Sequence, residues 1–325
     1  MRVGIVGYGN LGKGVEAAVN IAEDMELTCI VTRRDPSKLE VKSSVPVVSY
    51  ENIDTLIGKV DVMIICAGSA FDLPEMTPYL ASKFNVVDSF DTHADIPEHF
   101  VNVDKCAKLG NNLGIISMGW DPGLFSLIRV IGESVLPSGN TYTFWGKGVS
   151  QGHSDAIRRI DGVLDARQYT VPVESTLDAV RKGSSEEFTP RKMHTRECFV
   201  VAAEGADKAE IERQIISMPN YFADYDTTVT FISQAELDEH HKGLPHGGRV
   251  IRAGHTGEVG AFLNTVEFSL DLESNPFFTA GALVAAARAA VRFSEEGISG
   301  CKTIFDIPPA YFSRLSDDEL RAKKL

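Results

Sequence analysis

The sequence predicts a two-domain α/β protein: a doubly wound parallel sheet plus an α+β domain with an open mixed sheet. This prediction rests on three observations. The first 34 residues read as strand, glycine-rich turn, helix and strand. Strand and helix patterns then alternate as far as Ser117. After Val135 the strand patterns become longer and more polar, which is typical of an open sheet with helices on one face.

The first strand, Arg2–Val6, is followed at once by the run Gly7-Tyr8-Gly9-Asn10-Leu11-Gly12 and a helical pattern ending near Glu23. A G-x-G-x-x-G run between a strand and a helix is the form expected of a dinucleotide site. Gly7 permits the tight turn, Gly9 lets the backbone approach a pyrophosphate, and Gly12 allows close packing of helix on strand. The helix N-terminus presents free N–H groups to the phosphates. We therefore predict a Rossmann-type domain; the alternative is a tight turn in another kind of α/β protein.

The end of the second strand, Leu27–Val31, indicates which cofactor is bound. NAD-binding domains usually place an acidic residue there for the ribose 2′-hydroxyl, about twenty residues beyond the glycines. Here Thr32 is followed by Arg33 and Arg34, and guanidinium groups bind phosphate bidentately. We predict NADP. The alternative is that both arginines are solvated and Asp35 turns inward to serve NAD.

Further strands and helices follow the same alternation. Several strands are continuous apolar runs, as expected for parallel strands covered on both faces. The strands are Val45–Val48, Val60–Cys66, Asn85–Asp88 and Leu113–Ser117, and the helical stretches are Ser49–Ile57, Pro74–Lys83 and Pro97–Lys108. Ligands of such sheets bind at the carboxyl ends of the strands, so we expect chemistry in the segments Ala67–Ser69, Ser89–Asp95 and Met118–Gly123.

A second domain is expected over residues 122–274, with residues 1–121 forming the dinucleotide-binding domain that 275–325 completes. Its predicted strands are Thr141–Gly146, Ala166–Val173, Glu197–Ala203, Asp226–Ile232 and Phe262–Leu272, with helices at Ser175–Arg181 and Asp207–Ser217. The alanine-rich stretch Phe278–Glu296 is predicted to be a long helix that packs on the first domain.

Composition excludes several functions. A net charge of −13 argues against nucleic acid or an anionic membrane as the main partner. The most apolar stretch, Ala280–Val291, is interrupted by Arg288, so no membrane span is expected. The five cysteines show no CxxC pairing, which indicates a reducing compartment and no structural zinc or other metal. The first strand leaves no room for a signal peptide, and a cytoplasmic location is expected.

Two aspartates follow the fifth and sixth predicted strands. Asp91 has no capping partner in the sequence, whereas Asp121 before Pro122 could be the N-cap of the next helix, a role worth about 1 kcal/mol; Asp95 before Pro97 could be a similar cap. His153 and His246 lie in glycine-containing segments, where function concentrates. Two carboxylates beside a nicotinamide suit a substrate that carries an ammonium group. The residues alone therefore indicate an NADP-dependent oxidoreductase with a positively charged substrate.

Longer motifs resemble the NADP-dependent meso-diaminopimelate dehydrogenase family over essentially the whole chain. They are Val6–Gly12, Arg33-Arg34, Gly119-Trp120-Asp121-Pro122-Gly123, Phe144-Trp145-Gly146, Ser150-Gln151-Gly152-His153-Ser154-Asp155, Met218–Tyr221 and Pro245-His246-Gly247-Gly248. The resemblance implies oxidative deamination of the D-centre of meso-2,6-diaminopimelate to L-2-amino-6-oxopimelate, ammonia and NADPH, in lysine biosynthesis, by a homodimer.

The resemblance also implies roles for individual residues. Asp91 and Asp121 would be catalytic and hold the reacting amine, and Trp145, Gln151 and Gly152 would shape the pocket around the D-centre. Thr170, Arg196, His246 and Asn275 would bind the distal L-amino acid end of the substrate. The cofactor would be held by Gly7, Tyr8, Gly9, Asn10, Leu11, Gly12, Thr32, Arg33, Arg34, Cys66, Ala67, Gly68, Ser69, Ser89, Phe90, Asp91, Met118, Gly119, Trp120, Asp121 and Pro122.

Two alternatives stay open at this point. One is another NADP-dependent oxidoreductase of two-domain form that acts on a different small amino or oxo acid. The other is a non-catalytic NADP-binding sensor or assembly protein, in which the acids after the fifth and sixth strands would be helix caps only.

Overall fold

The computed structural model describes residues 1–325, and the chain divides into two compact units. Unit 1 comprises Met1–Leu127 together with Pro276–Leu325, and unit 2 comprises Ile128–Asn275. The chain leaves unit 1 within helix α4 (Leu124–Val135) and re-enters it at the start of helix α10 (Asn275–Glu295).

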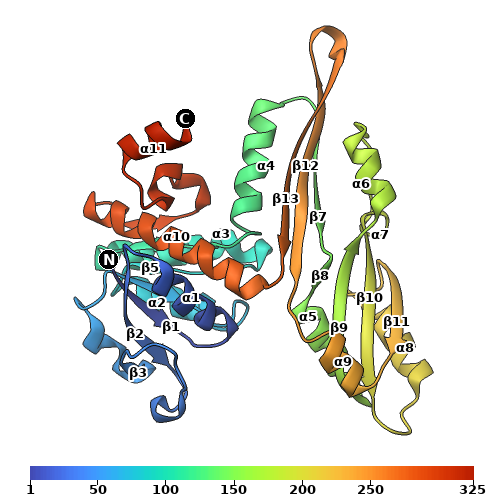
Figure 1. The fold of residues 1–325 in the computed structure, drawn as a ribbon, viewed down its shortest axis with the longest axis horizontal. Helices are drawn as coiled ribbons and strands as arrows, with labels where there is room; N and C mark the ends of the chain where they lie inside the picture. Colours follow the sequence, from blue (N-terminus) through green and yellow to red (C-terminus); the bar gives the residue numbers. More distant parts are fainter. The chain divides into compact units, whose positions relative to one another are not determined.

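Unit 1 is built on a seven-stranded sheet in the order β14-β6-β5-β4-β1-β2-β3 (Figure 1). Every neighbouring pair in it is parallel. The strands are β1 (Arg2–Val6), β2 (Glu26–Thr32), β3 (Val47–Ser49), β4 (Val62–Ile65), β5 (Val86–Val87), β6 (Leu113–Ile115) and β14 (Gly300–Lys302). The first six were expected from the sequence, but the three-residue β14 was not.

Helices cover both faces of this sheet because successive strand residues point to opposite sides. Val62 and Ile64 of β4 pack into a core with residues of α1 and α10, whereas Met63 and Ile65 pack into a second core with α2 and α3. The helical elements are α1 (Asn10–Ile21), η1 (Pro36–Lys38), η2 (Tyr50–Leu56), α2 (Leu73–Ala81), η3 (His93–Asp95), α3 (Ile96–Gly110), η5 (Ile304–Asp306), η6 (Pro309–Phe312) and α11 (Asp317–Lys324). The stretch predicted as a helix at Ser49–Ile57 is a 3₁₀ helix.

Unit 2 contains two sheets where the sequence suggested one. A mixed sheet has the order β11-β10-β9-β8, and an antiparallel sheet has the order β13-β12-β7. The strands are β7 (Asn140–Trp145), β8 (Gly148–Val149), β9 (Val163–Pro172), β10 (His194–Ala202), β11 (Asp226–Phe231), β12 (His246–Thr256) and β13 (Phe262–Leu272). The helical elements are α5 (Gln151–Arg158), α6 (Glu174–Arg181), α7 (Pro190–Met193), α8 (Lys208–Ser217), α9 (Gln234–His240) and η4 (Glu258–Gly260).

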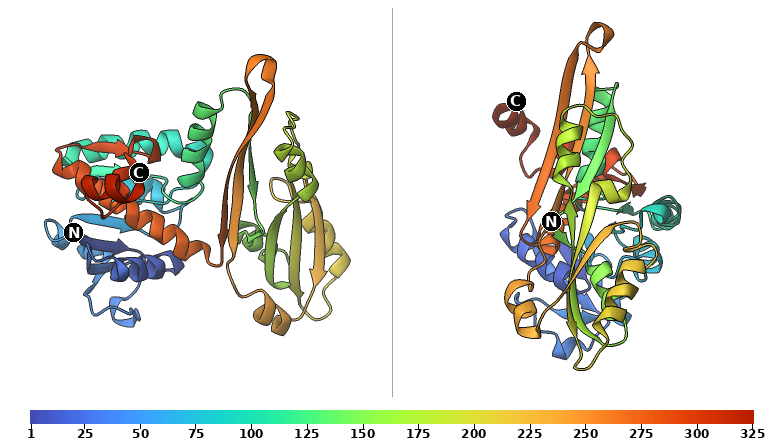
Figure 2. Two further views of the ribbon diagram at one scale, coloured as in Figure 1. Left: turned by 45° about the horizontal axis from the view of Figure 1, so that its top comes forward. Right: turned by 90° about the vertical axis from the view of Figure 1, so that its right-hand side faces the viewer.

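Strand β12 was not expected, because its first residues resemble a glycine-rich loop. It pairs with β13 along its whole length and continues past the end of β7 (Figure 2). Its glycines permit close backbone approach: a Cβ on Gly254 would lie 1.7 Å from the carbonyl oxygen of Ser138. The glycines of β12 therefore allow strand pairing that bulkier residues would prevent.

Helix α10 has the length and apolar composition of a membrane-spanning helix. Its alanines, among them Ala280, Ala286 and Ala290, are fully buried in the core of unit 1. The Nε of its Arg288 donates to Asp24 in unit 1 at 2.6 Å. This packing is that of a core helix in a folded domain, as the sequence predicted.

Candidate active site

The glycine turn joins β1 to α1 with the geometry that a dinucleotide site requires. Gly7 has φ +94°, and a Cβ on it would lie 2.6 Å from the carbonyl oxygen of Cys66. A Cβ on Gly12 would lie 2.3 Å from the carbonyl oxygen of Gly7, so the third glycine permits close packing of α1. By contrast, a Cβ on Gly9 would meet no atom within 4 Å. The second glycine faces open space, as expected where a ligand approaches the backbone.

The N-terminus of α1 fits an anionic group. Gly9 is its N-cap, no side chain caps it, and its first turn contains no acidic residue. Its N–H groups and its partial positive charge are thus available to a phosphate. The residues present therefore fit the pyrophosphate of a dinucleotide.

Both arginines after β2 are anchored by groups near this turn. The Nη1 of Arg33 donates to Asp72 at 2.8 Å, and the Nη2 of Arg34 donates to the carbonyl oxygen of Tyr8 at 2.6 Å. Asp35 instead accepts from the backbone N–H of Ser37 at 3.0 Å and caps η1. Its carboxylate is thus occupied by a local cap, contrary to the alternative in which it turns inward.

Asp91 lies in the loop after β5. Its backbone N–H donates to the Oγ of Ser69 at 2.9 Å, and the Ser69 hydroxyl donates back to the Asp91 carboxylate. Ser69 belongs to the segment after β4, so the structure joins two of the predicted strand-end segments. Asp95 lies at the N-cap of α3, but its side chain makes no capping hydrogen bond.

Asp121 lies in a turn that an isolated β-bridge between Trp120 and Gly123 closes. Helix α4 begins only at Leu124. The suggestion that Asp121 and Pro122 form the N-cap and first position of a helix from Pro122 is therefore wrong, because the bridge delays the helix start.

All the predicted cofactor residues lie at one edge of the unit 1 sheet. They follow β1, β2, β4, β5 and β6, and the carboxyl ends of parallel strands meet at the same edge. Aspartates 91 and 121 are at this edge as well. The structure thus brings the unit 1 candidates together.

Arg196 of β10 is the central residue of the candidates in unit 2. It lies opposite Thr170 of β9 and donates from Nη1 to the Thr170 hydroxyl. The residue is 7% exposed, and its Nε has no hydrogen-bond partner. Its guanidinium carbon lies 3.9 Å from the ring centroid of Tyr225. Burial lowers the pKa of Arg196, with Tyr225 acting in the opposite direction.

This buried cation has no acidic partner within ion-pair distance. Buried charges are ordinarily paired, because an unpaired one loses its hydration without compensation. A buried guanidinium that faces only a hydroxyl and an aromatic ring is therefore suited to a carboxylate supplied by a ligand.

His246 and Trp145 are joined to this pair through the segment Gly146–Gly148. Gly148 pairs with Thr170, and a Cβ on it would lie 2.6 Å from the ring of His246. The Nδ1 of His246 accepts from the N–H of Gly247 at 2.8 Å, so the ring proton of the neutral form is on Nε2. Burial lowers the pKa of His246, which favours this neutral form.

The other unit 2 candidates lie on neighbouring segments. Gln151 and Gly152 form the first turn of α5, where Ser150 is the N-cap and its N–H donates to the carbonyl oxygen of Gln168 at 3.0 Å. Gly152 has open space around its Cα. The N–H of Asn275 donates to the carbonyl oxygen of Leu244 at 3.0 Å.

Two residues beside the candidates were missed by sequence reasoning. The Nε2 of His194 accepts from the backbone N–H of Trp145 at 2.9 Å, and the two rings stack with centroids 5.5 Å apart. Burial, together with the charge of Arg196, lowers the pKa of His194 to about 4. Tyr225 is the other. A signal for His194 existed, since it precedes Arg196 by two residues on a strand and so shares its face.

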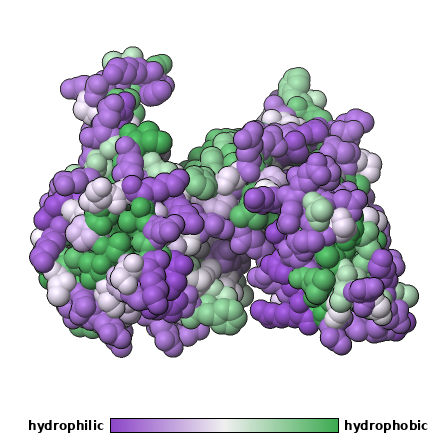
Figure 3. All heavy atoms as spheres, turned by 60° about the horizontal axis from the view of Figure 1, so that its bottom comes forward, coloured by the Kyte–Doolittle hydropathy of each residue, from purple (hydrophilic) through white to green (hydrophobic).

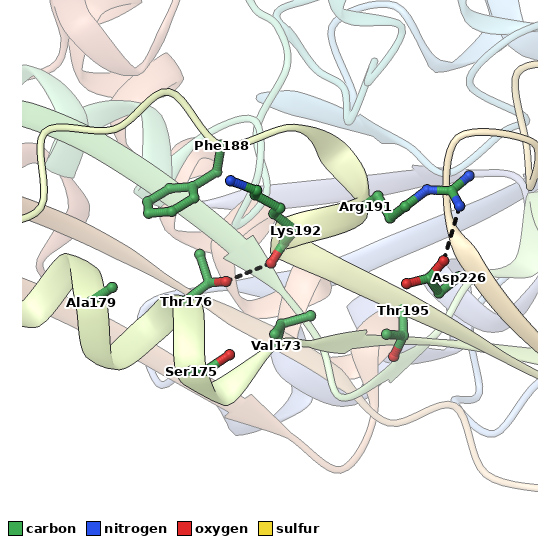
Figure 4. A pocket seen from close by; sticks show the side chains of 9 residues that line it. All are labelled: Val173, Ser175, Thr176, Ala179, Phe188, Arg191, Lys192, Thr195 and Asp226. Atoms are coloured by element: carbon green, nitrogen blue, oxygen red, sulfur yellow. Dashed lines mark hydrogen bonds and ion pairs between the residues drawn. The ribbon is translucent and has the colours of Figure 1, made fainter.

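A hollow of about 580 Å³ lies elsewhere in unit 2 and contains no predicted site residue (Figure 4). Its basic side chains are neutralised locally: Arg191 pairs with Asp226 at 3.1 Å, and Lys192 pairs with Glu186. The hydroxyl of Thr176 donates to the carbonyl oxygen of Lys192 at 2.6 Å. This hollow offers no uncompensated charge to a ligand.

Comparison with known proteins identifies the family. Residues 119–274 match the family described as "Diaminopimelic acid dehydrogenase C-terminal domain", and residues 1–104 match "Oxidoreductase family, NAD-binding Rossmann fold". The meso-diaminopimelate D-dehydrogenase of Ureibacillus thermosphaericus is 57% identical over 100% of this chain and 99% of its own. That of Corynebacterium glutamicum is 44% identical over 99% of this chain and 98% of its own. The chain belongs to the meso-diaminopimelate D-dehydrogenase family.

Solved structures of this family have the same fold. The Corynebacterium glutamicum dehydrogenase in complex with DAP is 43% identical, with a TM-score of 0.92 over 100% of this chain and 99% of that one. An engineered D-amino acid dehydrogenase bound to NADP⁺ is 42% identical, with a TM-score of 0.87 over 100% of this chain and 99% of that one. The predicted fold class and family are confirmed, and the protein is an oxidoreductase of the amino-acid dehydrogenase kind with an NAD(P)-binding Rossmann fold.

Proposed function

We propose that this member of the meso-diaminopimelate dehydrogenase family catalyses the reversible NADP-dependent oxidative deamination of meso-2,6-diaminopimelate at its D-centre. The products are L-2-amino-6-oxopimelate, ammonia and NADPH, in the dehydrogenase route of lysine biosynthesis. The observation that carries the proposal is the buried Arg196, which lacks an acidic partner and suits a substrate carboxylate. The protein would act in the cytoplasm.

Unit 1 would bind the cofactor. The pyrophosphate would lie on Gly9 and the uncapped start of α1, where the structure leaves open space. The remaining contacts would come from the strand-end segments Thr32–Arg34, Cys66–Ser69, Ser89–Asp91 and Met118–Pro122. The chemistry supplied by bound NADP⁺ is acceptance of a hydride from the D-configured carbon.

NADP rather than NAD is favoured by Arg33 and Arg34, whose guanidinium groups suit the 2′-phosphate. Arg33 is mostly exposed, and its partner Asp72 holds it by a single hydrogen bond. Asp35, the acid that would serve NAD, is occupied in capping η1.

Asp91 and Asp121 would hold the reacting amine. An ammonium group must lose a proton before hydride can leave its carbon, and a carboxylate within hydrogen-bond reach can accept that proton. One of the two aspartates would be this base. Ser69 keeps the Asp91 carboxylate in place through two hydrogen bonds.

Unit 2 would bind the substrate. Arg196 and Thr170 would contact the distal carboxylate, with His246 and Asn275 contributing polar contacts to the distal amino acid group. Trp145, Gln151 and Gly152 would surround the D-centre. A site built to hydrogen-bond a polar group rejects analogues that lack it, because its own buried groups are then left unpaired. We therefore expect poor turnover of simple D-amino acids.

We also propose a homodimer that forms through unit 2. Its hairpin β12–β13 exposes the apolar residues Val259, Phe262 and Leu263, and apolar patches interrupt a mainly hydrophilic surface (Figure 3). Exposed apolar residues close together favour association. Size-exclusion chromatography with light scattering tests this: a mass near that of one chain would contradict it.

A spectrophotometric assay tests the proposed function. The purified protein should form NADPH from NADP⁺ and meso-diaminopimelate at alkaline pH. Cofactor binding without NADPH formation would instead support a non-catalytic sensor. Turnover of a different amino or oxo acid in preference to meso-diaminopimelate would support another oxidoreductase.

A further inference from the structure

Asp88, directly after β5, is fully buried, and its carboxylate accepts four hydrogen bonds. Its Oδ1 accepts from the backbone N–H groups of Phe90 (3.1 Å) and Ser117 (2.9 Å). Its Oδ2 accepts from the Thr77 hydroxyl (2.8 Å) and from Nε2 of His99 (2.7 Å). Because a carboxylate only accepts, His99 carries a proton on Nε2.

These four donors come from four parts of unit 1. Thr77 belongs to α2, His99 to α3, Phe90 to the loop after β5, and Ser117 to the loop after β6. A carboxylate withdrawn from water is tolerated only when it is well hydrogen-bonded, and each Asp88 oxygen has two donors. Asp88 therefore connects two packed helices to the two loops that lead to Asp91 and Asp121.

The loop after β5 is fixed on both sides of Phe90. The ring of Phe90 is 2% exposed and stacks on the ring of His99 with centroids 4.3 Å apart. Its N–H is bound by Asp88, and the N–H of the next residue, Asp91, is bound by Ser69. The backbone of Asp91 thus has little freedom to move.

The loop after β6 begins with a strained residue. Ser117 has φ +57°, in the left-handed region that non-glycine residues rarely adopt. Such conformations cost on the order of 1–3 kcal/mol and persist only when the surroundings hold them. Asp88 holds this turn twice, through its carboxylate on the Ser117 N–H and through its carbonyl oxygen, which accepts from the Met118 N–H at 3.0 Å.

We propose that Asp88, supported by His99, is a positioning residue that sets the places of Asp91 and Asp121 for the reaction. This inference rests on the proposed function, because it takes those aspartates as the groups that hold the amine. A misplacement of about 1 Å in a catalytic group can lower a rate by about a hundredfold. Asp88 itself touches neither substrate nor cofactor in this account.

Four variants of the full-length protein test the inference. Asp88→Ala removes all four acceptors, whereas Asp88→Asn keeps an oxygen for both backbone N–H groups and lets Thr77 and His99 reverse their roles. His99→Leu removes one donor and the ring under Phe90. Val103→Ala is the matched control: Val103 is fully buried on the same face of α3, one turn after His99, and contacts neither loop.

Two readouts separate positioning from stability alone. The first is kcat per NADPH-binding site, with sites counted by NADPH fluorescence titration, so that an unfolded fraction does not lower the value. The second is hydrogen–deuterium exchange of the segments 88–91 and 116–121 compared with the rest of unit 1.

We expect Asp88→Ala to lower kcat per site by about tenfold or more, with faster exchange confined to the two segments. Asp88→Asn and Val103→Ala should both stay within about threefold of the wild type. A kcat per site of Asp88→Ala within threefold of wild type, an equal loss in Val103→Ala, or unchanged exchange in both segments would overturn the inference.

If Asp88→Ala does not fold, His99→Leu decides by the same criteria. If the wild type forms no NADPH from meso-diaminopimelate, the proposed function fails. Exchange then still decides whether Asp88 fixes the two loops: faster exchange confined to them supports it, and unchanged exchange overturns it.

Discussion

Replacing Arg196 by Met should separate function from stability. The guanidinium is buried and has no acidic partner. A hydrogen bond from a charged group contributes about 1.5–3 kcal/mol, and each 1.4 kcal/mol corresponds to about tenfold in affinity. The loss of one such bond to the distal carboxylate should therefore raise KM for meso-diaminopimelate by about ten- to 150-fold.

The same change should not destabilise the free protein. Met keeps much of the apolar volume and removes a cation that is desolvated without compensation, a replacement that is often neutral or stabilising. Only the hydrogen bond to the Thr170 hydroxyl is lost. We expect an unfolding free energy equal to or above that of the wild type, measured by urea denaturation.

Arg252 provides the matched control, since it is also 7% exposed and lies in unit 2. Its guanidinium donates to the carbonyl oxygens of Leu136 (2.9 Å) and Pro137 (3.0 Å) and to the hydroxyl of Thr141 (3.1 Å). Arg252→Met should therefore lower stability, because these buried acceptors lose their donor, and leave KM close to wild type.

Initial rates of NADPH formation give the kinetic result, with D-alanine as a substrate that lacks the distal group. Arg196→Met should leave the low kcat/KM for D-alanine unchanged. The reasoning is refuted if KM for meso-diaminopimelate does not rise, if both substrates lose equally, or if Arg196→Met destabilises the protein as much as Arg252→Met.

Three further predictions follow from the structure. Replacing Arg33 and Arg34 by Ala should weaken NADPH binding about tenfold or more relative to NADH, the value of a lost charged hydrogen bond; equal losses in fluorescence titrations would contradict the phosphate role. Gly12→Ala, whose Cβ would lie 2.3 Å from the Gly7 carbonyl oxygen, should lower the unfolding free energy by about 1–3 kcal/mol, whereas Gly9→Ala, with nothing within 4 Å, should weaken dinucleotide binding without that loss. Stability should fall as pH drops from about 6.5 to about 4, because the unfolded His194 gains a proton there while the folded one, with a pKa of about 4, does not; the loss is on the order of 3 kcal/mol and should be smaller in His194→Asn, as pH-dependent urea denaturation would reveal.

The parts of the fold that local sequence determines were predicted well. The glycine turn, the first six strands of unit 1 and the strand-end segments all follow from patterns within a few residues. The acids at the sheet edge were found because parallel strands place their carboxyl ends together. Asp121 was interpreted as a possible cap because its dipeptide with Pro122 permits one, whereas a bridge between Trp120 and Gly123 decides its conformation.

The parts that depend on distant chain segments could not be predicted. The three residues of β14 form a strand only because β6 pairs with them, and β12 needs both β7 and β13. The partners of Arg196 come from β9 and from the segment before β11, so the sequence shows the arginine but not its lack of an acid. Asp88 stands at the end of an apolar run, a visible signal whose meaning requires the contacts from α2 and α3.

The most direct test of the account compares stereoisomers of the substrate. The purified protein with NADP⁺ should convert meso-diaminopimelate to equal amounts of NADPH, ammonia and L-2-amino-6-oxopimelate. The LL-isomer has no D-centre and should yield no NADPH, and D-alanine should react poorly. Equal turnover of the LL- and meso-isomers, or of D-alanine and meso-diaminopimelate, would contradict the claim that the enzyme oxidises a D-centre while binding a distal L-amino acid group.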